Sequence, residues 1–231
     1  MPEIFLLLVS YFEVQPDLMK TEGLFRIAAS LDKLDELQVH VTMGNYYYLT
    51  LLKEEPHVVA NYLKKVLKYM GEPLCTFALY SRFRDLSDTP VPKRAAKLKE
   101  ICALLPPVNR NVFIFIIKFF LKVTKQSEHN KMNVHNLATV VTPNIFRPFE
   151  LTANDLIFAQ HLVETFKIMI TEYREVFSVT PEEEEGEGED EEILVISPYT
   201  NVASPKIVEE DLVGKVFQSQ RRKSQNEDSG G

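Results

Sequence analysis

Hydrophobic residues recur at intervals of three and four through the segment EPHVVANYLKKVLKYMG, residues 55–71. This spacing places them on one face of an α-helix, because the helix turns once in about 3.6 residues. Pro56 stands where a helix can begin, and Gly71 stands where one can end. The pattern predicts one amphipathic helix that buries Val59, Tyr62, Leu63, Val66, Leu67 and Met70.

Two further segments on either side of this one carry helical patterns. Ser30 is a candidate N-cap, and it precedes Leu31, Leu34 and Leu37, which are three residues apart. Residues 107–126 begin at the second of two consecutive prolines, and as a helix they would be apolar on nearly every side. The first segment predicts a surface helix, and the second predicts a central, fully buried one.

The last part of the pattern predicts two more helices. One runs from Asn133 until Pro143 stops it, because proline removes a backbone donor. The other is a single long amphipathic span over 154–177, with Leu156, Phe158, Leu162, Phe166, Met169 and Tyr173 on its apolar face. No segment alternates with a period of two, and the connections are short apart from the region around GNYYYL. We therefore expect a compact all-helical bundle over residues 1–178.

Charge divides the chain at Val179. Of its 33 acidic and 26 basic residues, 14 acidic but 5 basic residues lie from this position onward. The run PEEEEGEGEDEE repels itself and has no apolar face, so residues 179–231 are predicted to be an acidic, disordered tail. Two interpretations of the tail stay open. It is a solvated linker, or it is a docking segment with an anchor at 193–196 and a phosphorylation site at Ser224, after the basic residues 221–223.

Composition argues against several kinds of bound group. The chain has 8 glycines and no glycine-rich phosphate loop, so we do not expect it to bind a nucleotide itself. Cys75 and Cys102 stand apart without a CxxC motif, and the five histidines do not cluster, so no metal site is expected. Two buried, reduced thiols and no cofactor are the prediction.

The termini and the charge distribution also bear on location and partners. The apolar run in MPEIFLLLVSYF is much shorter than the roughly 20 residues that span a membrane, and it lacks a basic n-region. The basic residues lack the interleaved aromatic residues that are suited to nucleic acid. We therefore expect a cytoplasmic protein with no membrane segment and no nucleic-acid partner.

A charged residue interrupts the apolar stretch of TEGLFRIAAS. Arg26 lies in a loop between two predicted helices, where apolar neighbours can anchor the backbone and leave the guanidinium pointing outward. The alternative is that a nearby carboxylate, Glu22 or Asp32, pins the arginine in an ordinary ion pair.

Three more polar residues are candidates for a site, although each has an ordinary explanation. Lys64 and Lys68 are four residues apart and share a helix face, which is also typical of a solvated surface. Asn144 follows Pro143, where its amide can either cap local backbone or reach across a surface.

Taken in order, the blocks TEGLFR, HVVANYLKKVLKYMGEPL and HNKMNVHNLATVVTPNIF resemble the three motif blocks of the RhoGAP domain over about residues 4–177. This module switches off Rho-family small GTPases. The resemblance implies an all-helical fold. It also implies that Arg26 matches the catalytic arginine finger, that Lys64 matches the lysine on the helix behind it, and that Asn144 matches the asparagine that meets the GTPase switch region.

This resemblance implies a mechanism based on charge. Negative charge grows on the γ-phosphate as its bond breaks, and a guanidinium inserted from another molecule stabilises it with a fork of donors. The partner that the resemblance implies is a Rho-family GTPase of the Rho or Rac type, which would hold the GTP and Mg²⁺. The chain itself is then a monomeric activator rather than an enzyme, and it needs no acid or base of its own.

The sequence departs from the family pattern at three places. Ile27, Ala28 and Ala29 follow Arg26 where the family usually has serine and glycine, so the turn is expected to be stiffer. Lys68 stands where a second arginine usually braces the finger loop, and Gly71 replaces a proline. We therefore predict that activity survives but is modest.

Two other functions stay open at this point. The same fold can dock a GTPase without accelerating hydrolysis, as a binding or scaffold module. Alternatively, an unrelated helical scaffold acts through its acidic tail, in which case removing 179–231 abolishes function and Arg26→Ala has no effect.

Overall fold

The computed structural model describes residues 1–179, and every regular element in this range is a helix. The prediction of an all-helical fold is confirmed. The predictions for the tail, including Ser224, concern residues outside the described range apart from Val179. The α-helices and the 3₁₀ helices (η) are α1 (Glu3–Val14), η1 (Pro16–Lys20), α2 (Leu31–Thr42), α3 (Tyr48–Leu51), α4 (Pro56–Tyr69), α5 (Tyr80–Arg84), η2 (Asp85–Asp88), η3 (Val91–Lys93), α6 (Arg94–Ala103), α7 (Pro107–Lys125), α8 (Ser127–Asn130), α9 (Val134–Ile145), α10 (Ala153–Ile157), α11 (Ala159–Thr171) and α12 (Tyr173–Phe177).

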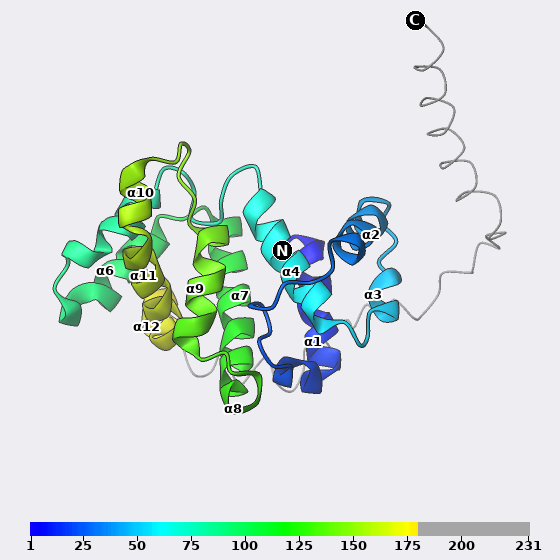
Figure 1. The fold of residues 1–231 in the computed structure, drawn as a ribbon. Coiled ribbons are helices and arrows are strands. Elements are labelled where there is room, and N and C mark those ends of the chain that lie inside the picture. The colour runs from blue at the N-terminus through cyan, green and yellow to red at the C-terminus, as the bar shows by residue number, and fades with distance from the viewer. Residues whose placement is uncertain (180–231) are drawn as a thin grey trace, which may run out of the picture. The chain divides into compact units, whose positions relative to one another are not determined.

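Helix α7 is central, between α1 and α4 on one side and α11 and α12 on the other (Figure 1). Seven of its side chains are buried, among them Phe113, Ile116 and Phe120. Asn111 and Lys122 are exposed. The central position is therefore as predicted, but the helix is not fully buried, because one side of it reaches solvent.

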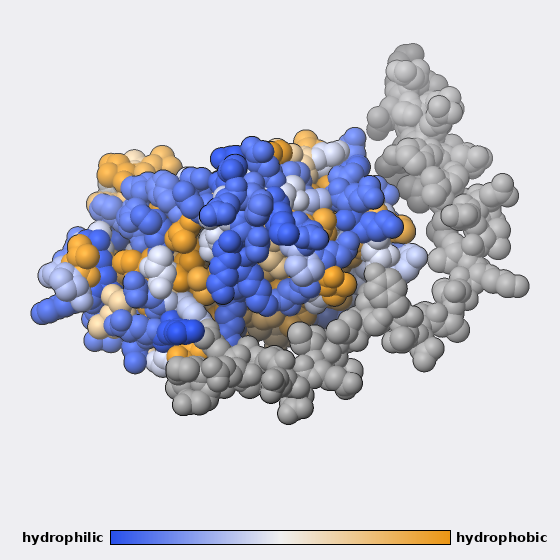
Figure 2. Space-filling view, turned by 90° about the horizontal axis from the view of Figure 1, so that it is seen from below, coloured by the Kyte–Doolittle hydropathy of each residue, from blue (hydrophilic) through white to orange (hydrophobic). Residues whose placement is uncertain are grey.

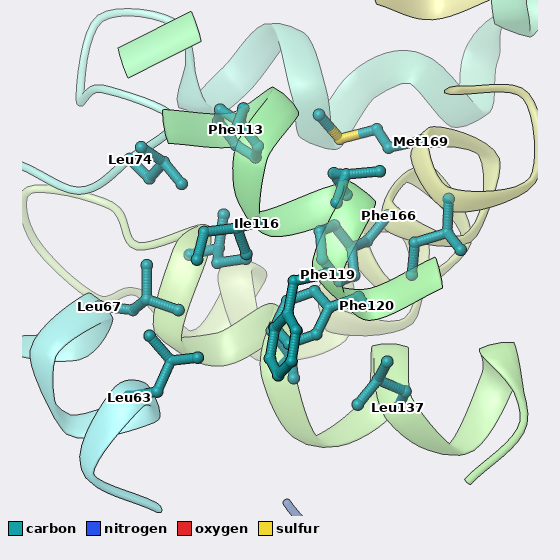
Figure 3. Close-up of a cluster of buried hydrophobic side chains, with 14 of the residues drawn as sticks. Leu63, Leu67, Leu74, Phe113, Ile116, Phe119, Phe120, Leu137, Phe166 and Met169 are labelled. Atoms are coloured by element: carbon teal, nitrogen blue, oxygen red, sulfur yellow. The ribbon is translucent and has the colours of Figure 1, made fainter. Parts of the chain in front are cut away.

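The core joins α4, α7 and α11. Figure 3 shows leucines of α4, the aromatic side chains of α7, and Phe166 and Met169 of α11 gathered in one interior. The rings of Phe120 and Phe166 lie 6.1 Å apart in an edge arrangement. Each fully buried side chain of this size contributes roughly 1.5–3 kcal/mol, so this shared interior stabilises the packing of α4, α7 and α11.

Helix α4 confirms the amphipathic helix that the sequence predicts. It begins at Pro56, whose missing N–H costs nothing in the first turn, and it ends at Tyr69. Val59, Tyr62, Leu63 and Leu67 are buried as predicted, whereas Val66 and Met70 are only partly buried. The opposite face, which carries the lysines, is left toward solvent.

Helix α9 does not stop at Pro143, contrary to the sequence prediction. It includes Pro143 and continues to Ile145. Ile145 is fully buried, and Phe146 packs its ring 5.2 Å from that of Phe83. Burial of these two residues outweighs the one backbone hydrogen bond that the proline removes.

The predicted single helix over 154–177 is also wrong, since three helices occupy this range. α10 ends at Ile157, and α11 and α12 are separated at Glu172, whose φ and ψ are −113° and 29°. Leu156 was expected to be buried, but it is 67% exposed. The break at Glu172 lets α12 pack against α6 and places Phe177 beside Phe113 of α7, so tertiary contacts override the local periodicity.

Helix α2 begins at Leu31 as predicted, but its start is not capped as expected. The Ser30 side chain makes no capping hydrogen bond, and Leu31 is 75% exposed. Leu37 is the buried residue through which α2 packs toward α4. A short helix, α3, occupies the region that follows α2 and was expected to be a longer loop.

Both cysteines are buried and free, which confirms the prediction of two reduced thiols. Burial raises the pKa of the Cys75 thiol to about 12, and it raises the pKa of Cys102 to about the same value. A thiol with such a pKa holds little of the reactive thiolate at neutral pH.

The face seen in Figure 2 is largely hydrophilic, with separate groups of hydrophobic residues among the polar ones. Within residues 1–179, none of the helices combines the length and the apolar character that crossing a bilayer requires.

Candidate functional site

The loop that carries Arg26, residues 21–30, joins η1 to α2 and is called the Arg26 loop below. Its backbone turns tightly, because the amides of Arg26 and Ile27 both donate to the carbonyl of Gly23, at 2.8 and 2.9 Å. Leu24 and Phe25 are fully buried, whereas Arg26 is exposed. The loop therefore presents one charged side chain on a backbone that is anchored to the core.

Phe25 has a φ of 69°, in the left-handed region that side chains other than glycine rarely adopt. This conformation costs roughly 1–2 kcal/mol. The Phe25 ring lies 5.4 Å from that of Phe120 and 6.1 Å from that of Phe119, both on α7. Burial of the ring offsets the backbone strain, so the turn that exposes Arg26 is maintained by the core.

Gly23 has a specific reason to be glycine. Its φ is +67°, and an added Cβ would lie 2.7 Å from the Ile27 side chain. Its N–H donates to the carbonyl of Asn130 at 2.7 Å. The tight approach of this backbone therefore ties the Arg26 loop to the end of α8.

Asn130 is a fully buried residue whose role the sequence analysis missed. Its amide Nδ2 donates to the carbonyls of Met19 and Val123, both at 2.8 Å, and its Oδ1 accepts from the amide of Met132 at 2.7 Å. It joins η1, α7 and the Arg26 loop. The residue lies in the motif HNKMN, but nothing in the local sequence indicates that it is buried.

Two side chains of α4 reach the Arg26 loop. Lys64 is half-buried, and its Nζ donates to the carbonyl of Phe25. Burial lowers the pKa of Lys64 from its ordinary value. Asn61 donates from Nδ2 to the carbonyl of Ile27 at 2.8 Å, a contact that the sequence analysis did not anticipate.

Arg26 itself is not held by a carboxylate. Within residues 1–179 it has no ion pair, so the structure gives no support to pinning by Glu22 or Asp32. Its guanidinium lies on the surface, with Nη2 near the position that a Gly23 side chain would occupy. The group is available to an anion on another molecule.

Lys68 is one turn beyond Lys64 on α4 and is exposed. Its Nζ lies over the ring of Tyr69, 5.5 Å from the ring centre. In the described part of the chain Lys68 makes no hydrogen bond to the Arg26 loop. The structure therefore brings Lys64, but not Lys68, into contact with this loop.

Asn144 is inside α9 rather than beyond its end. Its Nδ2 donates to the carbonyls of Val140 and Val141, at 3.0 and 3.2 Å. Helix α9 packs against α4, which is the helix that carries Lys64 and Lys68. Among the described residues, no hydrogen bond joins Asn144 to Arg26, Lys64 or Lys68.

The backbone conformation after Arg26 does not require a glycine. Neither Ala28 nor Ala29 is among the described residues with a positive φ. The glycine that the family usually has here is therefore not required by this backbone, and the positive φ values of the loop fall instead at Gly23 and Phe25.

The chemistry available at this site is electrostatic. An exposed arginine on an anchored loop supplies several N–H donors in a fixed planar fork, which matches the geometry of phosphate oxygens. Lys64 adds positive charge behind the loop but is engaged by a carbonyl. The arrangement can stabilise an anionic group that another molecule brings to Arg26.

Comparisons with known proteins bear on the family and the fold of the chain. Residues 2–150 match a family model described as the RhoGAP domain. The chain is 36% identical over 133 residues to Bargin from Homo sapiens, which covers 57% of this chain and 20% of that protein. It is 38% identical over 128 residues to Rho GTPase-activating protein 17 from Mus musculus, covering 55% of this chain and 15% of the relative. The chain thus spans about a fifth or less of the length of these curated relatives.

The fold also has a counterpart among solved structures. The crystal structure of human Rho GTPase activating protein 15 superposes with a TM-score of 0.67 at 21% sequence identity, covering 76% of this chain and 83% of that one. At this identity the likeness establishes the helical fold.

Proposed function

This chain belongs to the RhoGAP domain family, and on that premise we propose that it accelerates GTP hydrolysis by a Rho-family small GTPase through Arg26 supplied in trans. Family membership removes the hypothesis of an unrelated scaffold that acts through the acidic tail. The partner holds GTP and Mg²⁺, so the chain acts as an activator and supplies one catalytic side chain.

One observation carries this proposal: the guanidinium of Arg26 is exposed and unpaired within the described chain, on a loop whose neighbours Leu24 and Phe25 are fully buried. A catalytic group must reach the partner without losing its position. The buried residues limit the motion of the backbone, and the exposed side chain extends from it.

The proposed mechanism follows from the charge of the transition state. As the bond to the γ-phosphate breaks, negative charge grows on the leaving oxygen and on the transferred group. The fork of Arg26 donates hydrogen bonds to these oxygens and stabilises the charge as it develops. In this proposal Lys64 positions the loop, while Lys68 and Asn144 contribute to the surface that meets the GTPase.

The experiment that tests this function is single-turnover GTP hydrolysis by purified Rho, Rac and Ras GTPases, with and without the full chain. We expect acceleration of at least one Rho-family member and none of Ras. Binding to a GTP-loaded Rho-family GTPase without acceleration would contradict the proposed activity and would favour a docking module.

Lys68→Arg is expected to raise the maximal single-turnover rate by about two- to fivefold, roughly the effect of one added hydrogen bond. An arginine can make two parallel hydrogen bonds where the Lys68 ammonium, which now lies over Tyr69, makes none to the loop. The rate is measured at saturating concentrations of the activator. An unchanged maximal rate would show that weak bracing at this position does not limit activity.

A further inference from the structure

The two peptide carbonyls that flank Arg26 are both held by side chains of α4. Lys64 donates to the carbonyl of Phe25, and Asn61 donates to the carbonyl of Ile27 at 2.8 Å. Asn61 and Lys64 are three residues apart, so they lie on the same face of the helix. A rigid helix therefore holds the loop on both sides of Arg26.

The Asn61 amide is itself fixed in place. Its Nδ2 has two hydrogens, and it donates to the carbonyl of Ile27 and also to the carbonyl of His57 in the preceding turn of α4, both at 2.8 Å. The second hydrogen bond holds the side chain in one orientation. The contact with the Arg26 loop is therefore preorganised rather than made by a freely rotating group.

The hydrogen bond from Asn61 matters most for the part of the loop that follows Arg26, residues 27–30. Before Arg26 it is anchored by two buried side chains and by the hydrogen bond from Gly23 to Asn130. After it, Ile27 and Ala28 are exposed, and Ala29 is only partly buried. Within residues 1–179, Asn61 supplies the one side-chain hydrogen bond from another element to this part of the loop, in addition to the backbone hydrogen bond from the Leu34 amide of α2 to the Ser30 carbonyl at 3.1 Å.

We infer that Asn61 is a positioning residue for Arg26, supplying through the Ile27 carbonyl the second brace that Lys68 does not supply in this structure. This inference rests on the proposed function, since Arg26 is the group that it positions. Asn61 does not touch the partner's reacting atoms. It limits the directions in which the Arg26 side chain leaves the backbone.

The position of the loop can be tested without any GTPase, by hydrogen exchange of the segment 24–30 in the full chain. Asn61→Ala is expected to speed amide exchange in this segment by about 3- to 10-fold. The amides of Arg26 and Ile27 donate within a turn, and without the Asn61 hydrogen bond this turn opens more often. Alanine favours the helix, so α4 still forms in the variant. Asn109→Ala is the matched control, since it removes the same kind of hydrogen bond, to the Leu74 carbonyl at 3.1 Å, and leaves the exchange of 24–30 unchanged.

The catalytic consequence is measured on the Rho-family GTPase that responds to the unmutated chain. Asn61→Ala is expected to lower the maximal single-turnover rate about 3- to 10-fold, with an unchanged activator concentration at half-maximal rate. In an Arg26→Ala background the same change is expected to have no further effect, because Asn61 acts through Arg26.

The outcomes separate this inference from the proposed function. Unchanged exchange of segment 24–30 in Asn61→Ala, or an equal loss of rate with and without Arg26, would overturn the role of Asn61. Absence of acceleration by the unmutated chain would instead overturn the proposed function, and the exchange measurement would still decide whether Asn61 holds the loop.

Discussion

Arg26→Ala is expected to lower the accelerated single-turnover rate of a responsive Rho-family GTPase by about 10³-fold or more, or roughly 4 kcal/mol of barrier. The substitution removes the one exposed guanidinium that the Arg26 loop presents. The backbone has no reason to change, because Leu24 and Phe25 keep their places in the core. Hydrolysis is followed at saturating concentrations of the variant.

Arg26→Lys is the informative control for this experiment. A lysine keeps the positive charge but acts as a point charge, so it cannot donate to two oxygens in a fixed plane. We expect it to recover only a small part of the lost rate, while both variants still bind the GTP-loaded partner. If Arg26→Ala kept the acceleration within about threefold, the role of this arginine would be refuted.

Asn130→Ala is expected to lower the free energy of unfolding by about 3 kcal/mol. The variant leaves the carbonyl of Met19 and the amide of Met132 without their Asn130 partner, and the Val123 carbonyl keeps only the hydrogen bond from the Gln126 amide at 3.1 Å. Water cannot replace the lost hydrogen bonds at low cost, because the residue is fully buried. The measurement is urea unfolding, with the slope of the transition compared between the variants.

Asn136→Ala provides the matched control for stability. This asparagine lies in the same part of the chain and also donates to a backbone carbonyl, that of Lys131 at 3.0 Å, but it is only partly buried. Its loss is expected to change the free energy of unfolding by no more than about 0.5 kcal/mol. Equal stabilities for the Asn130 and Asn136 variants would show that the buried network does not hold this region together.

The elements that the sequence predicts well are those whose evidence is local. The boundaries of α4 follow from Pro56, from the spacing of its apolar residues and from Gly71, all within one short segment. The anchoring of the Arg26 loop follows from the apolar residues Leu24 and Phe25 in TEGLFR, whereas an outward guanidinium was one of two alternatives that this segment left open. Such features depend on neighbours within a few residues, so they can be inferred before the fold is known.

The sequence predictions that were wrong concern competition between local and distant contacts. The extension of α9 past Pro143 depends on burying Ile145 and Phe146 against other helices. The break at Glu172 depends on where α12 meets α6. A local sequence pattern indicates the energetic cost of a proline or a helix break. It does not indicate the stabilisation that comes from packing against residues elsewhere in the chain.

The sequence by itself determined the helical fold, the family and the candidate residues Arg26 and Lys64. The tertiary structure decided how the loop is held: Asn61 meets Ile27 across 34 positions, and Asn130 meets Met19 across 111. The physical reason is that an amide side chain has no periodicity that shows its partner. Its hydrogen bonds exist only after packed hydrophobic helices have brought distant backbone groups within about 3 Å of it.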